Sequence, residues 1–166
     1  MQRLRFPVRS THHHMHALEL RIPPLALVLA FASGMVVIAY TVPAAVAVPW
    51  RIALTIALAL AGAMVALAGV VAFRNHSTTV NPFTPEQSSS LVSTGIYRIS
   101  RNPMYLGFVL ALAGLSAFLA NWAAALLIPA FIAYMNWFQI RPEERALEQR
   151  FGHEFATYSA TVRRWL

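Results

Sequence analysis

Two stretches of the chain carry side chains that could bind a charged ligand. The first surrounds an Asn-Pro pair and consists of Tyr97, Arg98, Arg101, Asn102, Pro103 and Tyr105. Asn is favoured just before a helix and Pro at its first position, so the sequence predicts a helix that begins at Pro103. Helix amino termini attract anions, and a carboxylate or phosphate could therefore bind beside the two guanidinium groups.

The same residues also fit a simpler interpretation. Arg98 and Arg101 could contact lipid headgroups, while Tyr97 and Tyr105 could belong to an aromatic belt at a membrane surface. Both arrangements are common in membrane proteins, and the spacing alone leaves both interpretations open.

The second stretch lies near the carboxyl end. Pro142 is predicted to open a helix whose first turn holds Glu143 and Glu144, where the helix dipole favours acids. A carboxylate pair beside an apolar run loses solvation unless a cation lies near, and Arg141 or a cationic ligand could fill that role. An apolar stripe then predicts an amphipathic helix on the cytoplasmic surface, interrupted at Gly152: Leu147, Phe151, Phe155, Tyr158 and Val162.

The elements that position these residues are long apolar runs. The 166-residue chain is 58% hydrophobic and only 11% charged. Four runs approach the roughly 20 apolar residues that a membrane-spanning helix needs: Ile22–Val42, Trp50–Phe73, Met104–Ala120 and Trp122–Ile140. Asn121 separates the last two, and we expect a tight hairpin there because one continuous helix would overshoot the bilayer. The predicted fold is an all-α integral membrane protein with about four transmembrane helices and a cytoplasmic amphipathic C-terminal helix.

The arginines predict the orientation of the spans. All 13 cationic Lys and Arg positions are Arg, and every one except Arg51 lies in the amino-terminal, middle or carboxy-terminal segment. The positive-inside rule therefore places both termini and the middle loop in the cytoplasm of a multi-pass protein, in keeping with a bacterial inner membrane. We expect one membrane domain, 1–166, made of an N-terminal tail (1–21), a first helix pair (22–73), a cytoplasmic loop (74–103), a helical hairpin (104–140) and a C-terminal segment (141–166).

Several other classes of protein fit poorly. The net charge of +7 flanks apolar runs instead of covering a soluble face, which favours the lipid bilayer over nucleic acid as a partner. The chain has no Cys, so thiolate chemistry is excluded. A His-rich tail, His12, His13, His14 and His16, could bind a metal, but a fortuitous polar tail is favoured, and no metal site is expected. The first apolar run is too long for a signal peptide cleaved after Ala45-Val46-Ala47.

The two stretches together carry a family resemblance. The segment SLVSTGIYRISRNPMYLG, the later Pro142-Glu143-Glu144, and the spacing E-x2-L-x3-FG-x2-F-x2-Y-x3-V-x-R from Glu144 to Arg164 resemble the isoprenylcysteine carboxyl methyltransferase family. That family is in turn similar to phospholipid methyltransferases. The resemblance covers about Phe73–Trp165, and the two motifs lie in the expected order.

The resemblance implies a membrane enzyme that binds S-adenosylmethionine at its cytoplasmic face, under the carboxy-terminal segment, and releases S-adenosylhomocysteine. It implies these cofactor contacts: Ser89, Ser90, Leu91, Val92, Tyr97, Asn102, Pro103, Met104, Tyr105, Glu143 and Glu144. Arg101 and Arg141 are the candidate catalytic residues, and Arg98 and Arg141 the candidates for binding the acceptor. Eukaryotic members have His where this chain has Asn102, and an amide cannot carry a proton near neutral pH.

The methyl acceptor has several possible identities. A carboxylate on a prenylated cysteine or another lipophilic molecule is favoured, because it is already ionised and needs no general base. A phospholipid amine and a small thiol are the alternatives. Two other classes of function also remain open: a non-enzymatic membrane subunit or transporter, and an NADPH-dependent reductase, because membrane sterol reductases share a related carboxy-terminal half.

Overall fold

The computed structural model describes residues 22–75 and 90–166. Within these ranges the regular secondary structure is helical, apart from one isolated bridge between Ala45 and Asn121. The α-helices are α1 Pro24–Thr41, α2 Arg51–Asn75, α3 Pro103–Leu119, α4 Trp122–Ala125, α5 Leu127–Tyr134, α6 Arg141–Phe151 and α7 His153–Thr161. A 3₁₀ turn, η2, spans Gly95–Arg98, and a π-helical segment, η3, spans Met135–Ile140.

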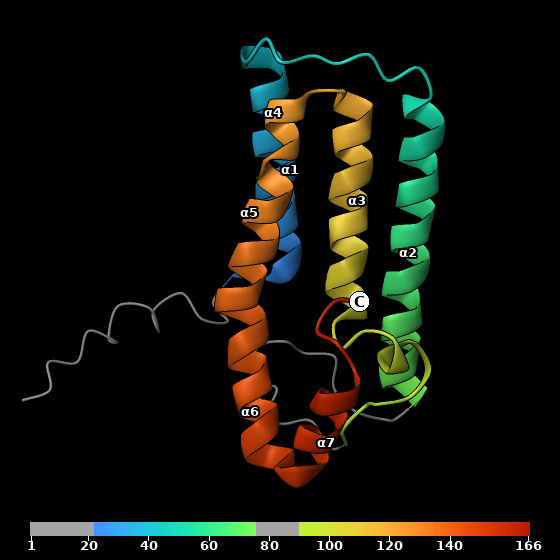
Figure 1. The fold of residues 1–166 in the computed structure, drawn as a ribbon, viewed down its shortest axis with the longest axis vertical. Coiled ribbons are helices and arrows are strands. Elements are labelled where there is room, and N and C mark those ends of the chain that lie inside the picture. Colours follow the sequence, from blue (N-terminus) through green and yellow to red (C-terminus); the bar gives the residue numbers. More distant parts are fainter. Residues whose placement is uncertain (1–21, 76–89) are drawn as a thin grey trace, which may run out of the picture.

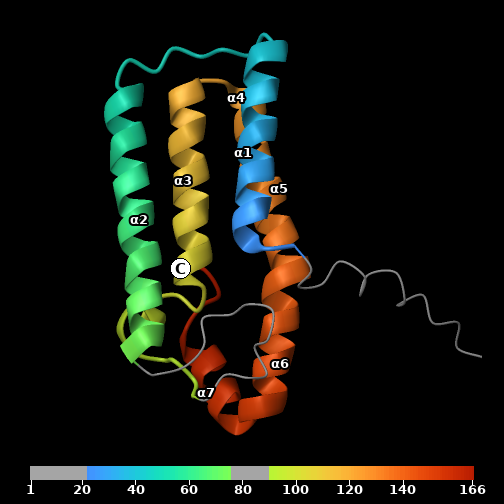
Figure 2. The ribbon, with the colours of Figure 1, turned by 180° about the vertical axis from the view of Figure 1, so that it is seen from behind.

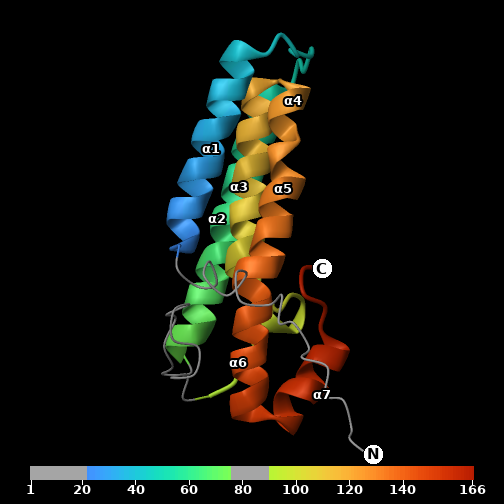
Figure 3. The same ribbon diagram turned by 90° about the vertical axis from the view of Figure 1, so that its left-hand side faces the viewer.

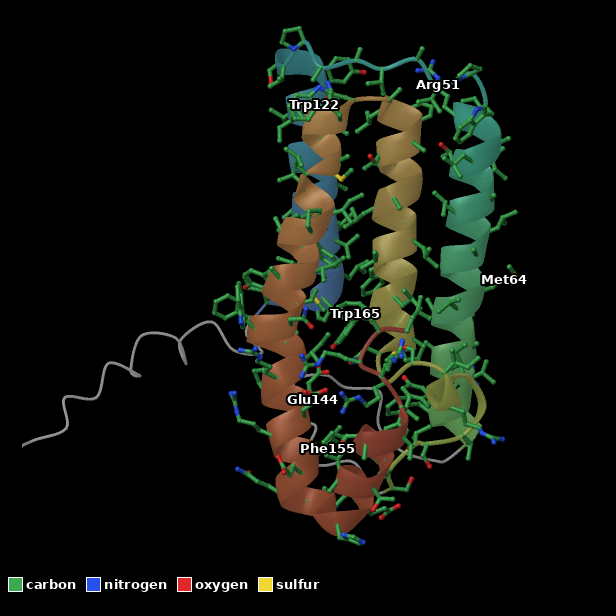
Figure 4. The ribbon with its side chains drawn as sticks, in the orientation of Figure 1. Arg51, Met64, Trp122, Glu144, Phe155 and Trp165 are labelled. Atoms are coloured by element: carbon green, nitrogen blue, oxygen red, sulfur yellow. The ribbon has the colours of Figure 1, made fainter. Side chains whose placement is uncertain are left out.

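The predicted class, an all-α membrane protein, is confirmed. Three helices are long and apolar enough to cross a membrane, Pro24–Thr41, Arg51–Arg74 and Trp122–Phe151, and α3 is a shorter apolar helix. Many large apolar side chains face outward, such as Met64 on α2, which is 65% exposed (Figure 4). An exposed apolar surface of this extent is typical of contact with lipid.

Helix α3 lies at the centre of the bundle, with α2 on one side and α1 and α5 on the other (Figures 1 and 2). Small residues let α2 and α3 touch through their backbones: a Cβ atom added to Gly107 would lie 2.6 Å from the carbonyl oxygen of Gly62. Thr55 strengthens the same contact, because its Oγ1 donates to the carbonyl of Gly114 at 3.1 Å. This close packing is the one expected where lipid supplies no hydrophobic force between helices.

The hairpin predicted at Asn121 is confirmed. Helix α3 ends at Leu119, Ala120 adopts a left-handed conformation with φ of 48°, and α4 begins at Trp122. Both polar atoms of the Asn121 side chain form hydrogen bonds. Its Nδ2 donates to the carbonyl of Val42 at 3.0 Å, and its Oδ1 accepts from the N–H of Ala124 at 3.1 Å. One buried side chain thus caps α4 and ties the hairpin to the end of α1. We call this the hairpin end of the bundle.

The fourth span differs from expectation at its far end. We predicted a separate helix lying on the membrane surface after Pro142, but α5, η3 and α6 form one unbroken rod (Figure 3). Pro142 has no N–H to bond one turn back, and the wider π-helical turn just before it accommodates that gap. The predicted interruption at Gly152 is confirmed: φ of 50° and ψ of −116° reverse the chain into α7.

Candidate functional site

The candidate site lies at the opposite end of the bundle from the hairpin, which we call the site end. Three pieces meet there: the start of α3, the first turn of α6, and the C-terminal segment, residues 162–166 (Figure 1). Figure 4 shows Glu144 and Trp165 at this end, with Trp122 and Arg51 at the hairpin end. Residues from both sequence motifs therefore come together in space.

Tyr105 and Glu143 form the centre of the site. The Tyr105 hydroxyl donates a hydrogen bond to Glu143 Oε1 across 38 positions of sequence. The tyrosine is 6% exposed and belongs to the main hydrophobic cluster, which also contains Ile140. The structure thus brings together the phenol of the first motif and a carboxylate of the second.

Glu144 faces two guanidinium groups. Arg164 bonds it with both Nε, at 3.1 Å, and Nη2, at 2.5 Å, while Arg101 Nη2 lies 3.3 Å from its Oε1. Such fork-shaped contact is the strong form of an Arg–carboxylate pair. Arg101 Nε is buried and has no hydrogen-bond partner in the part of the chain that the structure describes. Neighbouring carboxylates therefore have different surroundings: Glu143 meets a phenol, and Glu144 meets two cations.

The C-terminal segment is held against the start of α3 by hydrogen bonds that its backbone carbonyl groups accept. The N–H of Arg101 donates to the carbonyl of Arg163 at 3.0 Å, and Asn102 Nδ2 donates to the carbonyl of Arg164 at 3.0 Å. Helix α3 begins at Pro103 with Asn102 just before it, as predicted, but the Asn102 side chain makes no cap bond. The amide is engaged by the C-terminal segment instead.

Tyr97 lies buried in η2, beside the end of α2. Its ring packs edge-on against Phe73, with 5.3 Å between centroids, and its carbonyl accepts a 2.7 Å hydrogen bond from the hydroxyl of Tyr158 on α7. Burial raises the pKa of Tyr97 far above its ordinary value and raises the pKa of Tyr158 to about 12. Both side chains are therefore neutral phenols at physiological pH.

The other predicted site residues have varied positions. Pro103 and Met104 pack on α2, where a Cβ added to Gly69 would lie 3.3 and 2.9 Å from their Cγ atoms. Val92 is buried, and Ser90 is half-buried. Leu91 and the exposed Arg98 line a cavity of about 700 Å³ against α7.

Two predicted residues do not join the centre described above. Arg141 is exposed at the first residue of α6, apart from the contacts of Glu143 and Glu144. Ser89 lies outside the described residues, as does the His-rich tail.

The sequence analysis missed a set of polar residues on and around the fourth span. Asn136 Oδ1 accepts a 3.1 Å hydrogen bond from Trp165 Nε1, and Gln139 Nε2 donates to the carbonyl of Ile22 at 2.8 Å. The signal was present, because polar side chains within an apolar span usually mark a site. Arg164 was also missed, although it ends the second motif.

Comparisons with known proteins support the methyltransferase resemblance. The family described as phospholipid methyltransferase matches residues 50–154. A curated relative, an uncharacterized protein of Haemophilus influenzae, is 44% identical over 63 residues, which are 38% of this chain and the whole of that protein.

Two plant proteins of Arabidopsis thaliana also match. Protein-S-isoprenylcysteine O-methyltransferase B is 31% identical over 77 residues, covering 46% of this chain and 39% of that protein. Protein-S-isoprenylcysteine O-methyltransferase A is 26% identical over 103 residues, covering 62% and 52%. The chain thus spans about half or less of these plant relatives, and no solved structure matches it significantly.

Proposed function

This chain belongs to the phospholipid methyltransferase family, and on that premise we propose that it transfers a methyl group from S-adenosylmethionine to a lipophilic acceptor at a membrane surface. The observation that carries the proposal is the meeting of Tyr105 with Glu143, beside Arg101, at one end of an apolar bundle. The resemblance assigns Tyr105 and Glu143 to the cofactor and makes Arg101 a candidate catalytic residue. Tyr105 and Glu143 come from motifs far apart in the sequence.

The side chains at the site end fit the methyl donor. S-adenosylmethionine supplies a methyl group bound to a sulfonium, together with an ammonium, a carboxylate and a nucleoside. We propose that the Glu143 carboxylate holds the ammonium and that Arg101, with its unpartnered Nε, holds the carboxylate. The buried rings of Tyr97 and Tyr105 would face the sulfonium, each contributing about 0.5–2 kcal/mol through the cation–π interaction.

Glu144 has a different part in this proposal. Its two oxygens are already engaged by Arg101 and Arg164, so it orients Arg101 and fixes the C-terminal segment instead of contacting the donor. The residues that we assign to the reaction act by holding the reactants together and excluding water. Correct alignment alone can supply several kcal/mol of rate enhancement.

For the acceptor, we propose a carboxylate on a prenylated cysteine or a similar lipophilic molecule. The two plant relatives are named for methylation of isoprenylcysteine, and a carboxylate needs no base from the chain. The exposed Arg98 and Arg141 would bind its charge. The second candidate is N-methylation of a phospholipid amine, which the name of the matching family favours.

We further propose that the site end faces the cytoplasm. Arg51 lies at the hairpin end (Figure 4). The other arginines of the described residues lie on segments at the site end (Figure 1): the last turn of α2, η2, the residues just before α3, α6 and the C-terminal segment. The positive-inside rule then sets the direction of all the spans. This orientation would expose the donor pocket to the compartment where the methyl donor is made.

Calorimetry on the detergent-solubilised protein tests the donor. We expect S-adenosylhomocysteine to bind and NADPH not to bind. Binding of NADPH alone would favour a reductase, and binding of neither would favour a non-enzymatic subunit; both results would contradict the proposal. Incubation with radiolabelled S-adenosylmethionine and total membrane lipid, followed by identification of the labelled product, then shows the acceptor.

A further inference from the structure

Gln139 is the most deeply buried polar side chain of the fourth span. The proposed function does not explain why a polar residue lies there. It lies in the π-helical segment η3 and is 1% exposed. Its Nε2 donates to the carbonyl of Ile22, but its Oε1 has no hydrogen-bond partner among the described residues. An amide oxygen in a membrane span cannot rely on water, so an unpartnered one needs an explanation.

The orientation of this amide is fixed by its partner. The oxygen and nitrogen of a glutamine are often hard to distinguish, but a carbonyl such as that of Ile22 can only accept. The nitrogen must therefore face Ile22, and the oxygen is left as a free acceptor. The hydroxyl of Tyr134, in the preceding turn, is likewise buried without a partner in the described part of the chain.

Of these two residues, Gln139 lies closer to the proposed donor site. Gln139 precedes Glu143 by four residues on one continuous rod, which places it about one helical turn, roughly 5–6 Å, closer to the bilayer centre. Tyr134, Trp165 and Ile22 pack around the same hydrophobic cluster that contains Tyr105. A lipophilic molecule approaching from the membrane would reach this level before it reached Glu143.

We propose that Gln139 Oε1 accepts a hydrogen bond from an N–H group of the methyl acceptor, with the Tyr134 hydroxyl as a second polar contact. The proposal rests on the methyltransferase function and narrows it to acceptors that carry an N–H close to the methylated atom. Two sources share this chemistry: the amino group of an ethanolamine phospholipid, which keeps two N–H bonds after it releases one proton to solvent and becomes the nucleophilic amine, and the amide N–H of a prenylated, acylated cysteine. A free acceptor oxygen selects for such a group because a ligand that lacks it leaves the oxygen unpaired.

Two matched ligand pairs test the proposal through affinity, measured by calorimetry in detergent with S-adenosylhomocysteine present. The first pair is short-chain phosphatidylethanolamine and phosphatidylcholine, whose quaternary ammonium has no N–H. The second is N-acetyl-S-farnesylcysteine and S-farnesyl-3-mercaptopropionate, which keeps the thioether and carboxylate but lacks the amide. We expect the N–H member of one pair to bind at least about tenfold more tightly, and that pair identifies the source. No preference in either pair would overturn the proposal.

The variant Gln139→Met then separates ligand recognition from anchoring of α1. It keeps the length of the side chain and removes both amide atoms, so we expect the preference to fall to about one while the ligand without N–H binds as before. If Gln139 only anchors Ile22, both members of the pair will lose affinity equally, which would contradict the proposal. Tyr134→Phe should lower the preference less. If the Gln139 variant fails to fold, the loss of preference in Tyr134→Phe takes its place as the variant test, and an absence of preference in the wild type still overturns the proposal.

Methyl transfer measured on the same ligands separates this proposal from the proposed function. A preference for the N–H ligand without any methyl transfer would overturn the function and leave the N–H site standing. Methyl transfer with equal affinity for both members of each pair would overturn the N–H site and leave the function standing.

Discussion

The two ends of the bundle each bury a side-chain amide, and the two amides differ in one respect. At the hairpin end, Asn121 is 3% exposed, and both its oxygen and its nitrogen are bonded to the backbone. At the site end, Gln139 is buried as deeply, but only its nitrogen has a partner among the residues that the structure describes. A fully bonded amide stabilises the fold, whereas an unpaired buried atom costs about 1–3 kcal/mol.

The charges follow the same division. The described part of the hairpin end carries the exposed Arg51, and the site end carries the ion pairs of Glu144 and the bond between Tyr105 and Glu143. At the hairpin end, the hydrogen bonds of Asn121 stabilise the fold. The site end keeps buried polar atoms, such as Gln139 Oε1 and Arg101 Nε, that have no hydrogen-bond partner within residues 22–75 and 90–166. In our proposal, this contrast distinguishes a structural polar site from one that binds a ligand, and mutations can test it.

The largest effect is expected for Glu143→Gln. The variant keeps the shape of the side chain and a partner for Tyr105, but it removes the negative charge that we assign to the ammonium of the donor. Because hydrogen bonds to charged groups contribute about 1.5–3 kcal/mol, calorimetry should show a roughly 10- to 100-fold loss of affinity for S-adenosylhomocysteine. The melting temperature in detergent should change little.

The matched control for this variant is Glu148→Gln, which makes the same chemical change at an exposed position of the same helix. It should leave the affinity for S-adenosylhomocysteine unchanged. Equal affinities in wild type and Glu143→Gln would remove the donor site from this end of the bundle.

Asn121→Ala should give the opposite result. It removes the cap of α4 and the bond to Val42, so we expect a loss of about 1–3 kcal/mol in stability, measured by denaturation in detergent. Affinity for S-adenosylhomocysteine should stay within about twofold of wild type at temperatures where the variant is folded. Asn121→Asp keeps the oxygen that accepts from Ala124 but turns a second oxygen toward the carbonyl of Val42, so it should lose at least as much stability. A large loss of affinity in either variant would show that the two ends are not independent.

The smallest effect is expected for Arg141→Ala. The side chain is exposed, and exposed ion pairs contribute about 0.2–1 kcal/mol, so the KM for a carboxylate acceptor should rise by at most about fivefold. Affinity for S-adenosylhomocysteine should not change. A steady-state assay that shows no change in KM would remove Arg141 from the acceptor site.

Much of this architecture could be predicted from the sequence, because it depends on local patterns. Apolar runs of suitable length predict the spans, and Asn121 and Gly152 predict the reversals, since both residues favour such positions on their own. The meeting of the two motifs was expected only through the family resemblance. Hydropathy contains no information about which spans lie side by side.

The parts that could not be predicted depend on long-range contacts. Whether Asn102 caps a helix or bonds the C-terminal segment is decided by the carbonyl of Arg164, 62 positions away. The different surroundings of Glu143 and Glu144 depend on Tyr105, Arg101 and Arg164, which lie on other elements. The unbroken rod through Pro142 was missed because a proline was taken as the start of a new helix.

The continuous rod of α5, η3 and α6 fixes the distance between the residues that it carries. Gln139 and Glu143 stand on one continuous helix, so the gap between the groups proposed for acceptor and donor is set by helical rise, about 1.5 Å for each residue. Inserting a single residue between positions 139 and 143 would turn one group about 100° away from the other around the axis. If both proposals hold, the relative position of the two substrates depends on the register of this single helix.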